Sequence, residues 1–311
     1  MILNICTKSK ITYSIQPKKR NINDYINKGL IVINKVRGPT SHELASFIKK
    51  ILNINKVGHS GSLDPKVTGV QPIMLSKATK AVQILRLSGK EYICFLKLHR
   101  IVPENNIKKV ISDFEGIIYQ TPPVKSAVKR KLRKKKIYYI NILEMNKKNI
   151  LLKIGCEAGT YIRKLCHDIG LALGVGAHMQ ELVRSKVGPF EYRDCITIQK
   201  LSDAYDYWIK NGDDSKLRDV IIPMEEAFKY IPKIIIKETS IPSISNGFPL
   251  KRPGIISIDE NIKNDDIVGL FSSNGEIISL AKSMMNTKEI SNIKKGIVAK
   301  QISVFINKIN K

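Results

Sequence analysis

Apolar and polar residues alternate along the first third of the chain in a pattern that predicts both strands and helices. Residues 29–35 are rich in β-forming side chains and predict a strand that runs into a turn at 37–39. Thr40 and Glu43 then match a capping box, and apolar residues at helical spacing follow them. We therefore predict a helix that begins here and packs one apolar face inward.

The same alternation continues in the middle of the chain. Residues 92–99 predict a strand of a central sheet, and 104–115 predict an amphipathic helix that ends at Gly116. The paired prolines 122 and 123 exclude regular helix or central strand, so we predict a loop over residues 120–129.

Lysine or arginine occupies eight of the twelve positions from 125 to 136. A run of this kind is most often a solvated, disordered face. Two strand-like segments follow it directly, at 137–144 and 149–156. We therefore predict a folded hairpin with a basic tip, which would bind phosphates better than a disordered segment.

The sequence pattern changes once in the second half of the chain, from longer helix and strand patterns to short β-type runs. Residues 162–173 carry an apolar stripe at helical spacing that ends at Gly174, with Thr160 as the expected cap. A strand is predicted at 179–187, and 191–230 is helical in composition. Short β-type runs separated by turn residues then predict a small all-β domain.

Composition and charge narrow the class of protein. The chain has 311 residues, 43% of them apolar, and a formal net charge of +26, which predicts a polyanionic partner such as RNA, DNA or an anionic membrane. No segment resembles a signal peptide or approaches the roughly 18 apolar residues of a membrane helix, so we expect a soluble, intracellular protein and no membrane partner. The five cysteines and five histidines are scattered, and they predict neither disulfides nor a metal site.

One stretch, residues 58–69, combines three glycines with an aspartate that we expect to be buried, Asp64. Glycine permits unusual backbone angles and close approaches, and Pro65 restricts the residue before it, so Asp64 should be held rigidly. An Asp-Pro dipeptide alone is more often a turn than a catalytic site.

The whole of residues 58–69 resembles the catalytic loop of the TruB family of pseudouridine synthases, in its archaeal and eukaryotic dyskerin-like branch. Residues 35–41, 120–129 and 159–163 resemble further motifs of that family in the same order, and 246–282 resembles an RNA-binding PUA domain. The resemblance implies an α+β fold, with a catalytic domain around a mixed, largely antiparallel sheet and a small all-β PUA pseudobarrel. The implied domains are a basic extension (1–25), a catalytic domain (26–230) and a PUA domain (231–311).

The resemblance also implies roles for single residues. Asp64 matches the catalytic aspartate and Arg163 the arginine that pairs with it, while Tyr92 and Tyr161 match active-site tyrosines. The implied RNA contacts are His59 in the space left by a flipped nucleotide, Leu182 lining the pocket, Lys35 near a phosphate, and the basic residues Lys129, Arg130, Lys131 and Arg133.

Each of these residues also has an ordinary structural interpretation. Arg163 could be a solvated residue at a helix start, although a positive charge there opposes the helix dipole. Tyr92, Tyr161 and Leu182 could simply belong to the core. His59 could stabilise its loop, and Lys35 could be a solvated charge at a strand end.

The function implied is an RNA pseudouridine synthase that needs no cofactor. The enzyme would act within a box H/ACA particle that contains a guide RNA and small protein subunits. Its substrate would be ribosomal RNA, and the resemblance also allows transfer RNA at uridine 55. The alternatives are a stand-alone enzyme for uridine 55 of transfer RNA and, from another class, a non-catalytic RNA-binding assembly protein. The implied location is the cytoplasm of an archaeal-type cell, or the nucleolus if the chain comes from a eukaryotic-derived compartment.

Overall fold

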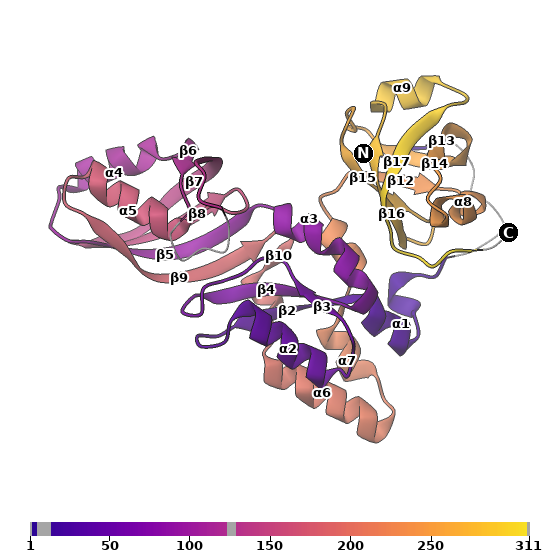
Figure 1. Cartoon of the computed structure of the whole chain (residues 1–311), viewed down its shortest axis with the longest axis horizontal. Coiled ribbons are helices and arrows are strands. Elements are labelled where there is room, and N and C mark those ends of the chain that lie inside the picture. Colours follow the sequence, from indigo (N-terminus) through magenta and orange to yellow (C-terminus); the bar gives the residue numbers. More distant parts are fainter. Residues whose placement is uncertain (1, 5–13, 123–128, 310–311) are drawn as a thin grey trace.

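Two β-sheets organise the chain. The structure, a computed structural model, describes residues 2–4, 14–122 and 129–309, and within this part ten strands form one sheet and seven form another. Figure 1 shows the larger sheet extending away from the smaller one. Within the described residues, no helix is long and apolar enough to cross a membrane.

The larger sheet contains the five strands predicted between residues 29 and 187, with bounds shifted by up to a few residues, and five strands that were not predicted. Its strands are β2 (Gly29–Lys35), β3 (Val57–His59), β4 (Thr68–Leu75), β5 (Lys90–Leu98), β6 (Gly116–Gln120), β7 (Arg133–Asn146), β8 (Asn149–Cys156), β9 (Ala177–Val187), β10 (Phe190–Glu191) and β11 (Ile222–Pro223). They lie in the order β11-β2-β4-β9-β5-β8-β7-β6, with β3 on β4 and β10 on β9. β4 and β9 pair in parallel, whereas the other paired strands of this sheet run antiparallel. The predicted α+β class with a mixed, largely antiparallel sheet is therefore confirmed.

Helices cover parts of this sheet and bury its apolar face. They are α1 (Ile22–Asn27), α2 (Ser41–Ile51), α3 (Val82–Leu87), α4 (Glu104–Asp113), α5 (Ile162–Ala172), α6 (Ile198–Asn211) and α7 (Ser215–Val220). α4 and α5 lie on one side of β5, β8 and β9, and the apolar side chains of these elements form one core. α2 and α6 enclose a second core against β2 and β4.

The helix that follows β2 begins as its sequence predicts. The Thr40 hydroxyl accepts a hydrogen bond from the Glu43 backbone N–H (3.1 Å), and the Glu43 carboxylate accepts one from the Thr40 backbone N–H (2.7 Å). This reciprocal capping satisfies two backbone donors at the start of α2.

The smaller sheet contains the short β-type runs of the second half. Its elements are β1 (Ile2–Asn4), β12 (Lys233–Ile236), β13 (Leu250–Lys251), β14 (Ile255–Asp259), β15 (Ile267–Phe271), β16 (Ile277–Ser283) and β17 (Ile297–Val304), with α8 (Ile241–Ser245) and α9 (Thr287–Asn292). Phe271 and Phe305 pack with Phe228 of the first domain, so the two sheets share a buried core.

The described part of the basic extension is tied to the body of the protein rather than being a free arm. β1 adds to the smaller sheet beside β14. The Arg20 guanidinium is buried and forms ion pairs with Glu225 (2.6 Å) and Glu276 (3.1 Å), and Glu276 also pairs with Lys28 (2.6 Å). These buried charges hold the extension against the segment after β11 and the segment before β16.

Candidate active site

The loop that carries Asp64 joins β3 to β4, and its backbone is held at several points. Gly69 has a φ of +108°, and a Cβ atom there would overlap the backbone oxygen of Arg184 on β9. The Val67 N–H donates to the Asp64 carbonyl (2.9 Å), and the Gly38 N–H donates to the Pro65 carbonyl (3.1 Å). These contacts support the prediction that Asp64 sits on a rigid loop.

Lys35 has a different place from the one its motif implied. Its side chain is completely buried, and its Nζ donates to the backbone oxygens of Val36 (3.0 Å), Pro65 (3.1 Å) and Val67 (2.8 Å). The expected phosphate contact is therefore wrong, because the ammonium group faces the inside of the loop. Burial lowers the pKa of Lys35, and the charge of Arg184 lowers it further. Through its hydrogen bonds to Pro65 and Val67, Lys35 holds the loop that carries Asp64 in place.

The structure brings Asp64 and Arg163 together. The Arg163 guanidinium forms an ion pair with the Asp64 carboxylate, and each side chain is about half exposed, at 53% and 54% respectively. The expectation that Asp64 is buried is wrong, because the loop presents its carboxylate outward. An exposed pair attracts only weakly in water, so its contribution to stability is small.

Gln120 positions the start of the helix that carries Arg163. Its side-chain oxygen accepts from the Tyr161 N–H (2.9 Å), and its Nε2 donates to the Tyr161 carbonyl (3.1 Å). Tyr161 is the N-cap of α5, so the expected cap at Thr160 is off by one residue; the Thr160 hydroxyl donates to the Glu157 carbonyl instead. The sequence analysis placed Gln120 only in a loop, and its contact with Tyr161 depends on tertiary structure.

Tyr92 lies beneath the loop of Asp64. Leu63 and Val67, on either side of Asp64, belong to the same buried core as Tyr92. Burial raises the pKa of Tyr92, although the charge and hydrogen bond of Arg184 oppose this effect. The phenol is therefore neutral near pH 7 and can donate a hydrogen bond.

Leu182 and His59 flank this arrangement. Leu182 is paired with Cys94 in the register of β5 and β9, and it packs against the core that contains Tyr92. His59 ends β3, and its Nδ1 accepts from the Gly61 N–H (3.4 Å). Burial lowers the pKa of His59, as do the positive charges of His42 and Arg184. His59 is therefore a neutral ring that can contact a base without adding charge.

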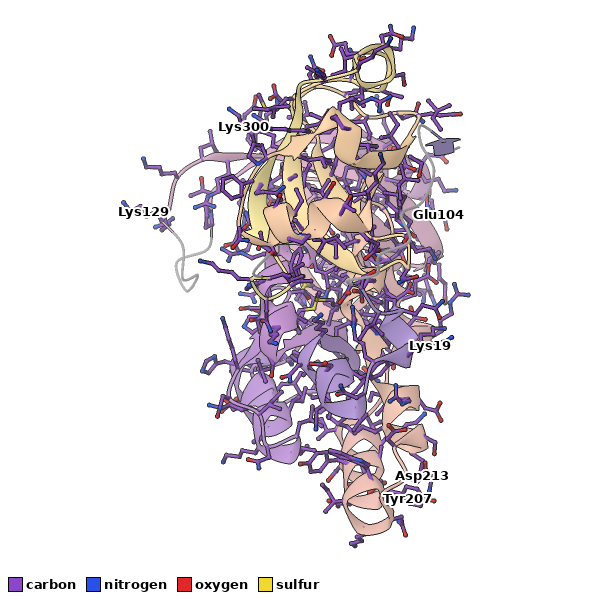
Figure 2. All side chains as sticks on the ribbon, turned by 90° about the vertical axis from the view of Figure 1, so that its right-hand side faces the viewer. Lys19, Glu104, Lys129, Tyr207, Asp213 and Lys300 are labelled. Atoms are coloured by element: carbon purple, nitrogen blue, oxygen red, sulfur yellow. The ribbon has the colours of Figure 1, made fainter. Side chains whose placement is uncertain are left out.

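The basic residues lie just before and at the start of β7, next to the end of β6. Lys129, Arg130 and Lys131 are exposed, and Figure 2 shows Lys129 projecting from the body of the protein. Arg133 begins β7 and pairs with Gln120 in the register of β6. Because Gln120 holds Tyr161, the basic run starts close to the tyrosine. Most of the predicted proline-containing loop, residues 123–128, lies outside the described residues.

Arg184 is the residue near this site that the sequence analysis did not select. It shares a face of β9 with Leu182, but its guanidinium is only 1% exposed and its register neighbours are Tyr92 and Gly69. No sequence motif pointed to it, because an arginine in a strand reads as a solvated residue. Within the described part of the chain, no group of three His, Cys, Asp or Glu residues could hold a metal ion.

Family models match most of the chain. The model described as TruB family pseudouridylate synthase (N terminal domain) matches residues 49–104 and 99–162, and that of the tRNA pseudouridylate synthase B C-terminal domain matches 163–229. The PUA domain model matches 232–305, and the DKCLD (NUC011) domain model matches 3–45.

Whole proteins are similar over nearly the full chain. A protein named probable tRNA pseudouridine synthase B from Methanosarcina acetivorans is 52% identical over 94% of this chain and 87% of its own length. The protein of the same name from Pyrococcus abyssi is 46% identical, over 94% of this chain and 88% of its own.

Two solved structures are also similar over nearly the full chain. The match in a Cbf5-Nop10-Gar1 complex has a TM-score of 0.93 and 44% identity, and covers 99% of this chain and 94% of the other. The match in an H/ACA RNP bound to a substrate RNA containing 2′-deoxyuridine has a TM-score of 0.92 and 41% identity, with coverage of 99% and 95%.

Proposed function

The chain belongs to the TruB family of pseudouridylate synthases, and on that premise we propose that it isomerises uridine to pseudouridine in RNA as the catalytic subunit of a box H/ACA guide particle. The observation that supports the proposal is the ion pair between Asp64, in the loop between β3 and β4, and Arg163, in the first turn of α5. The family resemblance assigned both residues to catalysis.

The reaction exchanges one bond to the sugar for another. The bond between N1 of uracil and C1′ of ribose breaks, the base rotates, a bond from C5 to C1′ forms, N1 gains a proton and C5 loses one. The Asp64 carboxylate can act as a nucleophile or as a base toward the sugar. No oxidation occurs, so the proposed reaction requires no redox cofactor.

Arg163 would orient the Asp64 carboxylate through their ion pair. The pair is exposed, so water weakens the attraction between the two groups. RNA bound over the pair would exclude water and strengthen this attraction. The pair would therefore become most effective only when substrate covers it.

The remaining site residues would hold the flipped nucleotide. A uridine must leave its stack to reach Asp64. We assign Tyr92 and Leu182 to contacts with the base, Tyr161 to its positioning or to proton transfer at C5, and neutral His59 to the space that the base leaves. Lys129, Arg130, Lys131 and Arg133 would bind phosphates without reading sequence.

The solved structures support the particle that we propose. Those structures contain Nop10 and Gar1 with Cbf5, or an H/ACA particle with substrate RNA, and this chain matches each relevant subunit over 99% of its length. We therefore propose a guide RNA and small proteins of these two kinds as partners, ribosomal RNA as a substrate, and the cytoplasm as the location.

A second candidate is the stand-alone modification of transfer RNA at uridine 55. The names of the two relatives favour it, because both are called probable tRNA pseudouridine synthase B. A purely RNA-binding function fits less well, since an exposed carboxylate facing a polyanion would only weaken binding unless it takes part in chemistry.

Tritium release from C5 of uridine tests this proposal directly, because C5 loses its hydrogen when it joins the sugar. We expect wild-type protein to release tritium in the presence of RNA and Asp64→Asn to release none above background. Asp206→Asn, at an exposed position on α6, should match wild type.

The RNA supplied to this assay separates the candidates. Release only with guide RNA and both small proteins supports the guided enzyme, and release from transfer RNA alone supports the stand-alone enzyme. RNA binding without release in either case would contradict catalysis and support an assembly protein.

A further inference from the structure

Arg184 is a buried cation with no acidic partner. Its guanidinium is 1% exposed, and within residues 2–4, 14–122 and 129–309 no carboxylate forms an ion pair with it. Its Nε donates to the Val70 carbonyl (2.8 Å) and its terminal nitrogen donates to Gln71 Oε1 (3.0 Å). An isolated buried charge is costly, and a well-packed apolar residue of similar size is often more stable in such a place.

A series of hydrogen bonds that meets at Gln71 Oε1 connects Arg184 to the loop of Asp64. Gln71 Oε1 accepts from Arg184 and also from the Ser41 hydroxyl (3.1 Å), and Ser41 Oγ in turn accepts from the Leu63 N–H (2.9 Å). Gln71 and Ser41 are both buried, so water does not compete for these bonds. Leu63 immediately precedes Asp64 and is fixed by this chain.

A second contact of Arg184 reaches Tyr92. The two residues lie opposite each other in the register of β5 and β9. Burial raises the pKa of Tyr92, and the nearby charge of Arg184 opposes that effect. A guanidinium only donates hydrogen bonds, so in front of it the phenol of Tyr92 can present its oxygen and keep its hydrogen for a different acceptor.

We propose that Arg184 is a positioning residue for the isomerisation, which orients the hydroxyl of Tyr92 and the loop of Asp64 relative to each other. One rigid planar group donates hydrogen bonds to Val70 and Gln71 on the side of the Asp64 loop and lies opposite Tyr92 on the other side, so it fixes the spacing between them. The proposal depends on the proposed function, because it assigns Arg184 a part in that reaction.

Arg184→Met tests the proposal, since methionine fills much of the same volume without hydrogen-bond donors. We expect the single-turnover rate of tritium release to fall about 10- to 100-fold, because small displacements of reacting groups have effects of this size. RNA affinity should be unchanged, since Arg184 is buried. Arg184→Lys keeps the charge without the planar fork and should be intermediate. The matched control is Arg193→Met, at an exposed arginine that pairs with Glu191.

Two further variants separate the contacts. Ser41→Ala interrupts only the path to Leu63 and should slow the reaction less than Arg184→Met does. Tyr92→Phe removes the oriented hydroxyl. Arg184→Met should therefore slow the Tyr92→Phe protein by a smaller factor than it slows wild type. Full additivity of the two rate effects would contradict action through Tyr92.

Amide hydrogen exchange provides a measurement that does not require activity. The Leu63 amide should exchange faster in Arg184→Met than in Arg193→Met, because Gln71 loses the donor that fixes it and can no longer hold Ser41, the acceptor of the Leu63 N–H, in place. If Arg184→Met lowers only the melting temperature and leaves the rate of tritium release per folded molecule unchanged, Arg184 has a structural role alone and the proposal is wrong. If wild type releases no tritium, the proposed function fails, and unchanged exchange at Leu63 would then also refute the positioning role.

Discussion

Close approach between Gly69 and Arg184 sets the geometry of single residues at this site. Gly69 lies in the part of β4 that pairs with β9, where the backbones of Gly69 and Arg184 approach closely. Arg184 can face Tyr92 and Gln71 at once only because residue 69 has no side chain. A glycine noted in the sequence for its conformational freedom is needed here mainly for space.

Gly69→Ala should therefore destabilise the protein by at least about 3 kcal/mol, since it adds a clash with backbone to the strain of a positive φ. Gly38→Ala is the matched control: its φ is +111°, but a Cβ atom there meets no neighbour within 4 Å. The control should lose only about 1 to 2 kcal/mol from the backbone conformation. Urea unfolding measures both values, and equal losses would show that the clash is relieved.

Among the helices and strands, the end of α3 depends on a lysine from the neighbouring strand. Lys90, the first residue of β5, donates through its Nζ to the carbonyls of Leu85 (3.1 Å), Arg86 (2.8 Å) and Ser88 (2.7 Å). These are carbonyls that a helix end leaves without intrahelical partners. Burial, with a further effect from the charge of Arg184, lowers the pKa of Lys90 to about 8.

This pKa predicts a dependence of stability on pH. The folded pKa of about 8 lies below the ordinary 10.5, so between these pH values the unfolded chain binds more protons than the folded one. Lys90 should therefore add stability as pH rises from about 8 to 10.5, by up to about 3 kcal/mol. The free energy of unfolding of Lys90→Met, measured in urea across this range, should lack that increase relative to wild type. Parallel profiles of the two proteins would contradict the prediction.

For the whole molecule, positive charge and the joined domains define a surface suited to RNA. The net charge is +26, and the basic residues 129–131 are exposed, with Lys129 projecting from the body of the protein (Figure 2). The buried ion pairs of Arg20 with Glu225 and Glu276 hold the extension against the segments next to β11 and β16. The basic tip formed by residues 129–131 and the PUA domain are therefore joined in one molecule that RNA can contact.

Binding of RNA should weaken steeply with salt, and the basic tip should account for part of the slope. Replacing Lys129, Arg130 and Lys131 with Gln should reduce the slope of log affinity against log salt by about 2, the value for three phosphate contacts on single-stranded RNA. Replacing Lys49, Lys50 and Lys210 with Gln removes equal charge from α2 and α6, and it should change the slope less. Equal changes in a filter-binding titration would mean that only net charge matters.

The elements of the fold were largely predictable, and so was the pairing at the site. β2 has its predicted bounds and α2 its predicted capping box, because both depend on local patterns and backbone chemistry. The pairing of Asp64 with Arg163 was expected from the family resemblance alone. The outward direction of Asp64 and the burial of Lys35 were not, because exposure depends on what the rest of the chain places above and below a residue.

Local patterns along the chain were enough to predict β2 and the start of α2, and the net charge predicted a polyanionic partner; the role of the loop with the key carboxylate came from the family resemblance. Contacts between distant segments decided the rest: Gln120 against Tyr161, Lys35 inside the loop, and Arg184 between Tyr92 and Gln71. The reason is physical. Propensity, capping and charge act over a few residues, whereas the burial of a cation and its choice of partners are set by which strands the sheet places side by side.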